Sequence, residues 1–176
     1  MVFIEMKIRL FGTVNDSIVD GPGLRYTVFT QGCPHHCPGC HNPDSHDFQG
    51  GYLGDIENIL KDIDKNPLLD GVTLSGGEPF SQAAVLIKLA KEIKKRNLHL
   101  MIYSGYTYEE IMDLNIDAVE LLKLCDTLVD GKFVDSLRSL SLLYCGSSNQ
   151  RIIDVQKSLQ NNCIIEYQAN EYGELR

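Results

Sequence analysis

Three cysteines on one short segment are the residues whose types and spacing point most directly to chemistry. Cys33, Cys37 and Cys40 follow the pattern Cys-x₃-Cys-x₂-Cys within residues 32–43. A four-iron cluster is ordinarily held by four cysteine thiolates, so three thiolates on one loop would hold three irons and leave the fourth open. The spacing therefore predicts a 4Fe-4S cluster with one iron free to bind a substrate.

A zinc site is the main alternative interpretation of the same cysteines. The three thiolates and one imidazole, from His35, His36 or His41, would complete a tetrahedral Cys₃His site. Structural zinc sites usually take their ligands from two loops, and no second pair of Cys or His follows downstream. The iron–sulfur interpretation is favoured, and a zinc-binding interaction domain stays open as an alternative from another class of protein.

A glycine pair followed by an acid forms a second candidate site. Gly76 and Gly77 leave backbone bare, so a ligand can approach it closely, and Glu78 offers an anionic acceptor for an ammonium group. A free amino acid would fit such a turn, although a glycine pair before a helix is also an ordinary tight turn. Ser104, before Gly105, would suit a ribose hydroxyl, and a Ser-Gly turn after a strand is equally commonplace.

The elements that must position these residues alternate between strand and helix. The pattern predicts strands at residues 1–11, 26–31, 72–75, 98–103, 127–130 and 163–167, and helices beginning after Asp55, Ser81 and Thr107. Thr107 and Glu110 have the spacing of a capping box. Such alternation implies right-handed parallel β-α units, in which ligands bind beyond the carboxyl ends of the strands. The cysteine loop and the polar turns all follow strands, so we expect them to meet at one mouth.

Length and charge limit the class of protein. The 176 residues fit a single α/β domain over residues 1–176 and are short for a complete eight-unit barrel. A net charge of −8 argues against nucleic acid and anionic membrane as partners, because both need clustered Lys and Arg. Residues 1–11, interrupted by Glu5, Lys7 and Arg9, lack the apolar centre of a signal peptide. We therefore expect a cytoplasmic protein with no membrane span.

The remaining cysteines are isolated from the triplet and from one another. In a reducing compartment, cysteines are metal ligands or free thiols more often than a disulfide framework. We expect Cys125, Cys145 and Cys163 to be buried structural thiols.

The cysteine triplet followed by Gly-Gly-Glu-Pro resembles the radical S-adenosylmethionine superfamily. Within it, the chain is similar to the family of activases that act on anaerobic ribonucleoside-triphosphate reductase. The segments that carry this likeness are residues 20–25, 31–43, 103–110 and 146–151. The last segment and the short length favour this family over two alternatives, namely activases of other glycyl-radical enzymes such as pyruvate formate-lyase, and carboxy-deazaguanine synthase.

The resemblance implies a fold and a set of contacts. The fold would be a short, open partial (β/α) barrel of parallel strands with the site at their carboxyl ends. Cys33, Cys37 and Cys40 would be the metal ligands and catalytic centre. The expected cofactor contacts are Gly39, Cys40, His41, Gly76, Gly77, Glu78, Ser104, Asp130 and Lys132. Gly39 stands where much of the superfamily has an aromatic residue.

The resemblance also implies a reaction. The open iron would chelate the amine and carboxylate of S-adenosylmethionine, and Glu78 would help to hold the amine. One electron would then cleave the sulfonium, giving methionine and a 5′-deoxyadenosyl radical that takes hydrogen from a glycine of the reductase. The implied partners are the large subunit of anaerobic ribonucleoside-triphosphate reductase and a low-potential electron donor such as a flavodoxin or ferredoxin.

Overall fold

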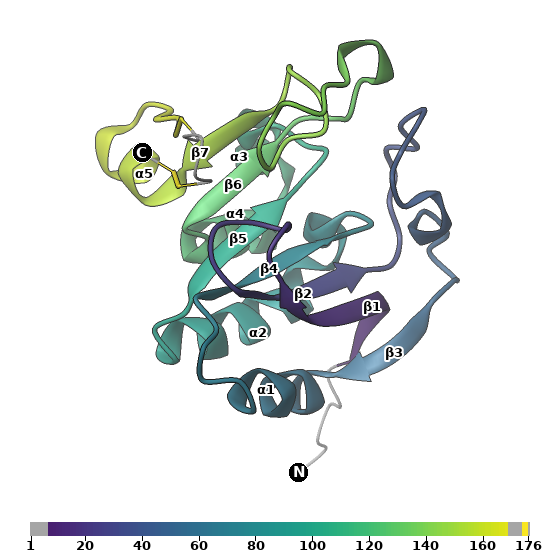
Figure 1. Ribbon diagram of the computed structural model, residues 1–176, viewed down its shortest axis with the longest axis vertical. Coiled ribbons are helices and arrows are strands. Elements are labelled where there is room, and N and C mark those ends of the chain that lie inside the picture. Colours follow the sequence, from purple (N-terminus) through teal and green to yellow (C-terminus); the bar gives the residue numbers. More distant parts are fainter. Residues whose placement is uncertain (1–6, 169–173, 176) are drawn as a thin grey trace.

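The computed structural model describes residues 7–168 and 174–175 (Figure 1). Within this part of the chain, one seven-stranded sheet has the order β3-β1-β2-β4-β5-β6-β7. The strands are β1 (Lys7–Ser17), β2 (Arg25–Thr30), β3 (Tyr52–Asp55), β4 (Gly71–Gly76), β5 (His99–Tyr103), β6 (Thr127–Asp130) and β7 (Arg151–Asp154). The helices are α1 (Ile56–Asp64), α2 (Ala83–Lys95), α3 (Tyr108–Leu114), α4 (Ile116–Leu124) and α5 (Val155–Asn161).

The centre of the sheet is parallel and its outer strands are antiparallel. β2, β4, β5 and β6 pair in parallel, as the alternation of strands and helices predicts. β1 pairs antiparallel with both β2 and β3, and β7 pairs antiparallel with β6. The expectation of parallel strands throughout is therefore wrong at both edges. Residues 18–24, which join β1 to β2, are too few for the crossover of a dozen or more residues that parallel neighbours require.

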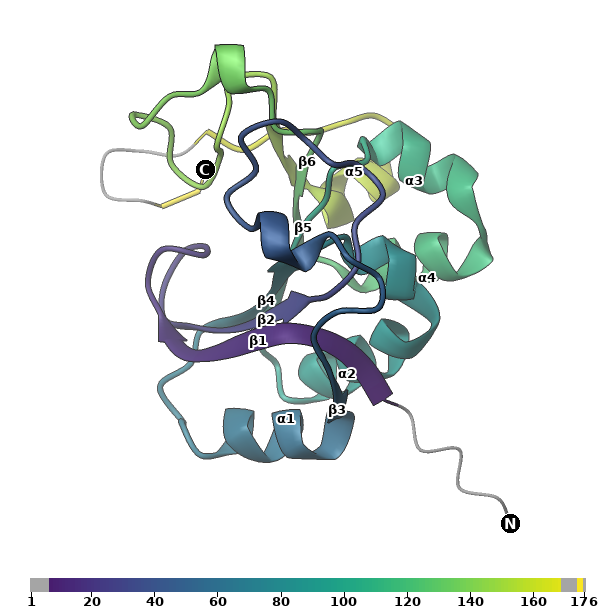
Figure 2. The same cartoon turned by 90° about the vertical axis from the view of Figure 1, so that its right-hand side faces the viewer.

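The two faces of the sheet differ in chemistry. Helices α1, α2 and α4 lie along one face (Figures 1 and 2). Alternate strand residues turn toward them, as Val72 and Leu74 of β4 do, and join the main hydrophobic core. The intervening residues give the other face a polar row, made of Arg25, Thr27, Thr73, His99 and Thr127. This polar face leads toward the carboxyl ends of the parallel strands.

Arg25 ties three parallel strands together on this polar face. Its side chain is buried, and its Nε donates to Thr73 Oγ1 at 2.6 Å. Its Nη2 donates to the carbonyl oxygens of Val72 at 2.8 Å and His99 at 3.1 Å. Burial lowers the pKa of Arg25 to about 10, which leaves the guanidinium charged at neutral pH. The interior of the sheet is thus held partly by hydrogen bonds to a charged group.

Two of the predicted helix starts are confirmed. Helix α1 begins directly after Asp55, although the Asp55 side chain makes no capping hydrogen bond. The capping box of α3 is complete, because Thr107 Oγ1 accepts from the Glu110 backbone N–H at 3.2 Å and Glu110 Oε2 accepts from the Thr107 backbone N–H at 2.8 Å. Together these bonds satisfy two N–H groups at the start of α3.

The start predicted after Ser81 is wrong by one residue. A 3₁₀ turn at Pro79–Gln82 comes first, and α2 begins at Ala83. Glu78 caps the turn by accepting a hydrogen bond from the backbone N–H of Phe80 at 3.0 Å. Pro79 is suited to the first position of such a turn because its φ is already fixed near the helical value. Glu78 therefore caps the 3₁₀ turn, and the residue at the N-cap of α2 is Gln82 and not Ser81.

The strands predicted at the two ends of the chain differ from those in the structure. Residues 1–6 of the first predicted strand lie outside the described residues, and β1 runs from Lys7 to Ser17. The predicted strand at residues 163–167 contributes an isolated bridge, between Glu166 and Ile153. No helix in the described part of the chain is long and apolar enough to cross a membrane.

Candidate functional site

The three clustered cysteines line one cavity beyond the carboxyl ends of the parallel strands. The cavity has a volume of about 540 Å³ and is lined by residues that follow β2, β4, β5 and β6. Those residues include Cys33, Cys37, Cys40, His41, Gly76, Gly77, Ser104, Gly105 and Gly131. The predicted shared cavity is therefore present, and it brings together segments that are far apart in sequence.

The thiols offer a donor set that suits a cluster. All three are free; Cys33 is buried, and the other two are partly exposed. Burial raises the pKa of the Cys33 thiol, which loses its proton when it becomes a metal ligand. Among the residues that the structure describes, no three His, Cys, Asp or Glu side chains already converge as they would around a single metal ion. A cluster spreads its thiolates over separate irons, so the donor types and the shared cavity fit it without such convergence.

The glycine turn packs directly on the start of the cysteine loop. The backbone N–H of Gly77 donates to Thr30 O at 2.7 Å, and that of Glu78 donates to Gly32 O at 2.8 Å. A Cβ added to Gly77 would lie 2.4 Å from Gly32 O, and Gly76 has a φ of +95°. Both positions therefore require glycine, and the turn fixes where the cysteine loop leaves β2.

The carboxylate of Glu78 is buried and fully hydrogen-bonded, with no exposed surface. Oε2 accepts from the Gly105 backbone N–H at 2.8 Å and lies 2.9 Å from His35 Nε2. Oε1 accepts from the backbone N–H of Phe80, and the Ser104 hydroxyl lies 3.0 Å from both oxygens. The sequence indicates His35 only as one of three possible imidazole ligands of a zinc site, and it does not predict this contact. A contact between residues 43 positions apart leaves no signal in one sequence.

The second half of the cysteine loop packs on residues 131–150. The His41 ring lies 5.3 Å from the Phe133 ring, centroid to centroid. Gly39 has a φ of +74°, and a Cβ there would lie 2.9 Å from Asp135 Oδ1. Gly39 is thus a packing position at the edge of the loop, whereas His41 faces the cavity. Their roles as cofactor contacts stay predictions.

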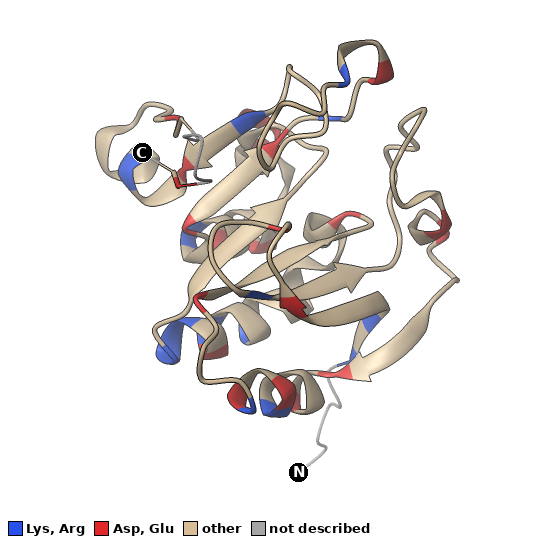
Figure 3. Cartoon of the chain, in the orientation of Figure 1, with Lys and Arg blue, Asp and Glu red and all other residues tan. Residues whose placement is uncertain are grey.

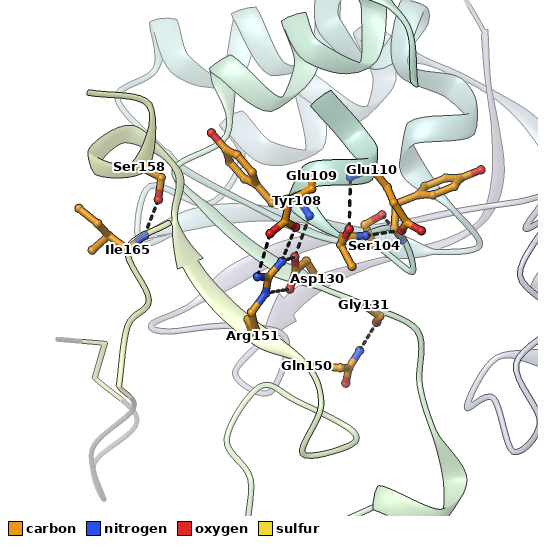
Figure 4. A network of polar contacts seen from close by, with 12 residues as sticks. Ser104, Tyr108, Glu109, Glu110, Asp130, Gly131, Gln150, Arg151, Ser158 and Ile165 are labelled. Atoms are coloured by element: carbon orange, nitrogen blue, oxygen red, sulfur yellow. Dashed lines mark hydrogen bonds and ion pairs between the residues drawn. The ribbon is translucent and has the colours of Figure 1, made fainter. Parts of the chain in front are cut away.

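Asp130 and Lys132 lie at a neighbouring cavity lined also by Arg151. Figure 4 shows the Asp130 carboxylate between the start of α3 and β7. It accepts from the Tyr108 backbone N–H at 2.7 Å and from Arg151 Nε at 3.0 Å, and Arg151 also contacts Glu109. Asp130 thus stabilises the junction of α3, β6 and β7, and Lys132 is exposed. That either residue contacts a cofactor stays a prediction.

The isolated cysteines divide into three environments. Cys125 is buried, as predicted, and its thiol donates to Thr127 O at 3.0 Å. The prediction is wrong for Cys163, which is exposed because it directly follows Asn162, the left-handed cap at the exposed end of α5. Cys145 is half-buried and lines the same cavity as the cysteine triplet, and burial raises its pKa to about 11.

The fold and the site together define an iron–sulfur protein. A family model described as a 4Fe-4S single cluster domain matches residues 19–153, which include the three cysteines and every segment that lines the cavity. Because the chain is 31–36% identical over about three quarters of its length to proteins of that name, it belongs to the family of anaerobic ribonucleoside-triphosphate reductase-activating proteins.

Curated relatives with that name cover most of the chain. The protein from Escherichia coli strain K12 is 36% identical over 141 residues, which span 76% of this chain and 90% of the relative. The Pasteurella multocida protein is 36% identical over 143 residues, covering 77% and 90%. The protein from Enterobacteria phage T4 is 31% identical over 141 residues, covering 76% and 86%.

Proposed function

We propose that this chain is the enzyme that activates anaerobic ribonucleoside-triphosphate reductase by generating a glycyl radical on its large subunit. Cys33, Cys37 and Cys40 hold a 4Fe-4S cluster, and S-adenosylmethionine binds beside it. The observation that carries the proposal is that these three free thiols line the same cavity as the Gly76-Gly77 turn and Ser104. Family membership supplies the reductase as the substrate.

The architecture is consistent with the short, open partial barrel of radical S-adenosylmethionine enzymes, and we propose that residues 1–176 form one such domain. The barrel strands would be β2, β4, β5 and β6, which pair in parallel. The polar face of the sheet, with Arg25 at its centre, would be the inside of the barrel.

Different residues of the chain would bind the cluster and the different parts of S-adenosylmethionine. When bound, a reduced cluster supplies the electron that cleaves S-adenosylmethionine into methionine and a 5′-deoxyadenosyl radical, which then abstracts hydrogen from the partner's glycine. The three thiolates leave one iron position open. Glu78 supplies an anionic acceptor for the α-amine, and Gly76 and Gly77 line the cavity beside it. Ser104 offers a hydroxyl at the same cavity.

The partner's glycine must enter this cavity, which opens to solvent past Val19, a residue 73% exposed. Residues 31–50, which carry the cysteine loop, contain no Lys or Arg, and no blue appears on this segment in Figure 3. Recognition along this side of the entrance therefore relies on shape and neutral hydrogen bonds more than on a basic patch. The electron would come from a low-potential donor such as a flavodoxin or ferredoxin.

The test is product formation by the anaerobically reconstituted chain. With S-adenosylmethionine and a strong reductant, mass spectrometry should detect 5′-deoxyadenosine. After addition of the reductase, electron paramagnetic resonance should detect a glycyl radical. Fully loaded protein that gives neither product in the presence of the reductase would contradict the proposal. Glycyl radical on another partner, with none on the reductase, would assign the chain to a different activase.

A further inference from the structure

The acceptor capacity of Glu78 is already used within the protein. An ionised carboxylate has about four lone-pair positions. Four donors reach them: the backbone N–H groups of Phe80 and Gly105, the Ser104 hydroxyl and Nε2 of His35. With no exposed surface, Glu78 cannot take up an ammonium group unless one of these donors leaves.

The four donors are not equally free to leave. Phe80 and Gly105 donate through backbone N–H groups, whose removal would require the turns themselves to change. The Ser104 hydroxyl is held in place because its Oγ also accepts a hydrogen bond from the Tyr106 backbone N–H at 3.0 Å. His35 is the one donor of the four on a long side chain, and a rotation about its side-chain bonds withdraws it.

The imidazole of His35 is held in one position by the packing around it. Its side chain is 5% exposed, and its ring meets the Tyr106 ring edge-on at 4.4 Å between centroids. A Cβ on Gly105 would lie 2.3 Å from His35 Cδ2, so glycine at this position leaves the space that the ring fills. Because the ionised carboxylate only accepts, Nε2 carries the proton in this contact. The ring thus presents an N–H where a ligand's N–H would otherwise lie.

We infer that His35 is an internal substitute for the α-amine of S-adenosylmethionine, and that it must leave Glu78 before the amine can bind there. This inference rests on the proposed function and adds a residue to it. The contact satisfies a buried carboxylate, and the need to break it lowers the affinity for the ligand. Because His35 lies between Cys33 and Cys37, its departure also changes the loop that carries the cluster ligands.

The experiment measures the affinity of S-adenosylmethionine for the anaerobically reconstituted chain, by equilibrium dialysis without reductant. His35→Ala removes the competing donor. Gly105→Ala displaces the ring while leaving His35 in the sequence. Both variants should bind S-adenosylmethionine about tenfold more tightly than the wild type, since a hydrogen bond to a charged group no longer has to be broken. His36→Asn is the matched control and should bind like the wild type, because the His36 ring instead meets the His46 ring edge-on.

A second measurement separates this substitution from simple loss of structure. Without S-adenosylmethionine, His35→Ala should unfold at a lower temperature than the wild type, because Glu78 loses a partner. Added S-adenosylmethionine should raise that temperature more in the variant than in the wild type. If His35→Ala does not take up a full cluster, Gly105→Ala provides the test with His35 in place.

The outcomes test the role of His35 separately from the proposed activase function. Fully loaded His35→Ala or Gly105→Ala that binds S-adenosylmethionine no more tightly than the wild type would overturn the inference. Glu78→Gln should bind more weakly in either case. If Glu78→Gln binds as the wild type does, Glu78 does not hold the amine. The formation of 5′-deoxyadenosine tests the proposed function independently of both results.

Discussion

Cys33, Cys37 and Cys40 share one loop and yet differ in exposure, because the loop starts under the glycine turn and then runs outward. Cys33 is 7% exposed, and its backbone N–H donates to His46 O at 3.1 Å. Cys37 and Cys40 lie further along the loop, where less of the protein covers them. A buried thiol and two partly exposed thiols then share the predicted cluster.

Replacement of Cys37 tests the ligand set directly. Cys37→Ala should abolish the iron–sulfur absorbance and reduce the iron and sulfide content after anaerobic reconstitution, because two thiolates cannot hold the cluster that three hold. Cys163→Ala is the control and should reconstitute normally, since Cys163 is exposed and does not line the cavity. A Cys37→Ala protein with a full cluster that responds to S-adenosylmethionine would exclude Cys37 as a ligand.

His99 predicts a pH dependence of stability. Burial and the charge of Arg25 lower its pKa to about 4, and its ring accepts from Arg25 and donates to Thr127. Between pH 6.5 and about 4 the unfolded chain binds the proton and the folded chain does not, so stability falls as the pH falls. His99→Gln should reduce the slope of unfolding free energy against pH, by up to about 1.4 kcal/mol per pH unit. Equal slopes for both proteins in urea would show that His99 is not buried as a neutral ring.

At the scale of elements, the parallel strands depend on a hydrogen-bonded interior as well as on the helices behind them. Arg25 joins β2 to β4 and β5 through one guanidinium. The main core lies on the opposite face, whereas on the Arg25 face these polar contacts lie beside a smaller apolar cluster of Met101, Val129 and Ile152. This arrangement leaves the carboxyl ends of the strands in fixed register beneath the cavity.

Arg25→Met tests that interior. The methionine keeps most of the aliphatic stem and removes the donors, so buried carbonyl oxygens and Thr73 lose partners at a cost of about 1–3 kcal/mol. Urea unfolding should therefore show a clearly lower free energy of unfolding. Arg96→Met is the control, because Arg96 pairs with Asp64 and Glu92 near the surface, where the expected loss is below about 1 kcal/mol. If the two variants lose the same free energy of unfolding, the buried hydrogen bonds of Arg25 contribute no more to stability than a surface ion pair does.

The sequence predicts the four central strands because they alternate and are bounded by clear turns. β3 escapes prediction, since four residues with Gly54 among them carry no apolar alternation. β7 follows the segment that carries the family likeness and has its partner in β6, so pairing rather than pattern defines it. At the site, the cysteine loop and the glycine turn are predictable from spacing. The contact of His35 with Glu78 is not, because it depends on how two loops meet.

For the whole molecule, metal content decides between the two classes of protein that the cysteine triplet permits. Protein isolated without oxygen should contain iron and sulfide and no stoichiometric zinc. Removal of the iron by a chelator should abolish 5′-deoxyadenosine formation, and reconstitution with iron and sulfide should restore it. One zinc per chain with no iron in such protein would support the zinc-binding interaction domain and end the enzymatic account.

The connectivity of the sheet also sets an order of events during synthesis. The cysteine loop follows β2, whereas the cavity around it also needs residues after β4, β5 and β6, up to Gly131 and beyond. A growing chain therefore exposes its three thiols well before the segments that shelter them have left the ribosome. Metal insertion into a finished cavity is a post-translational event, and the nascent chain passes through an interval in which its thiols are open to oxygen.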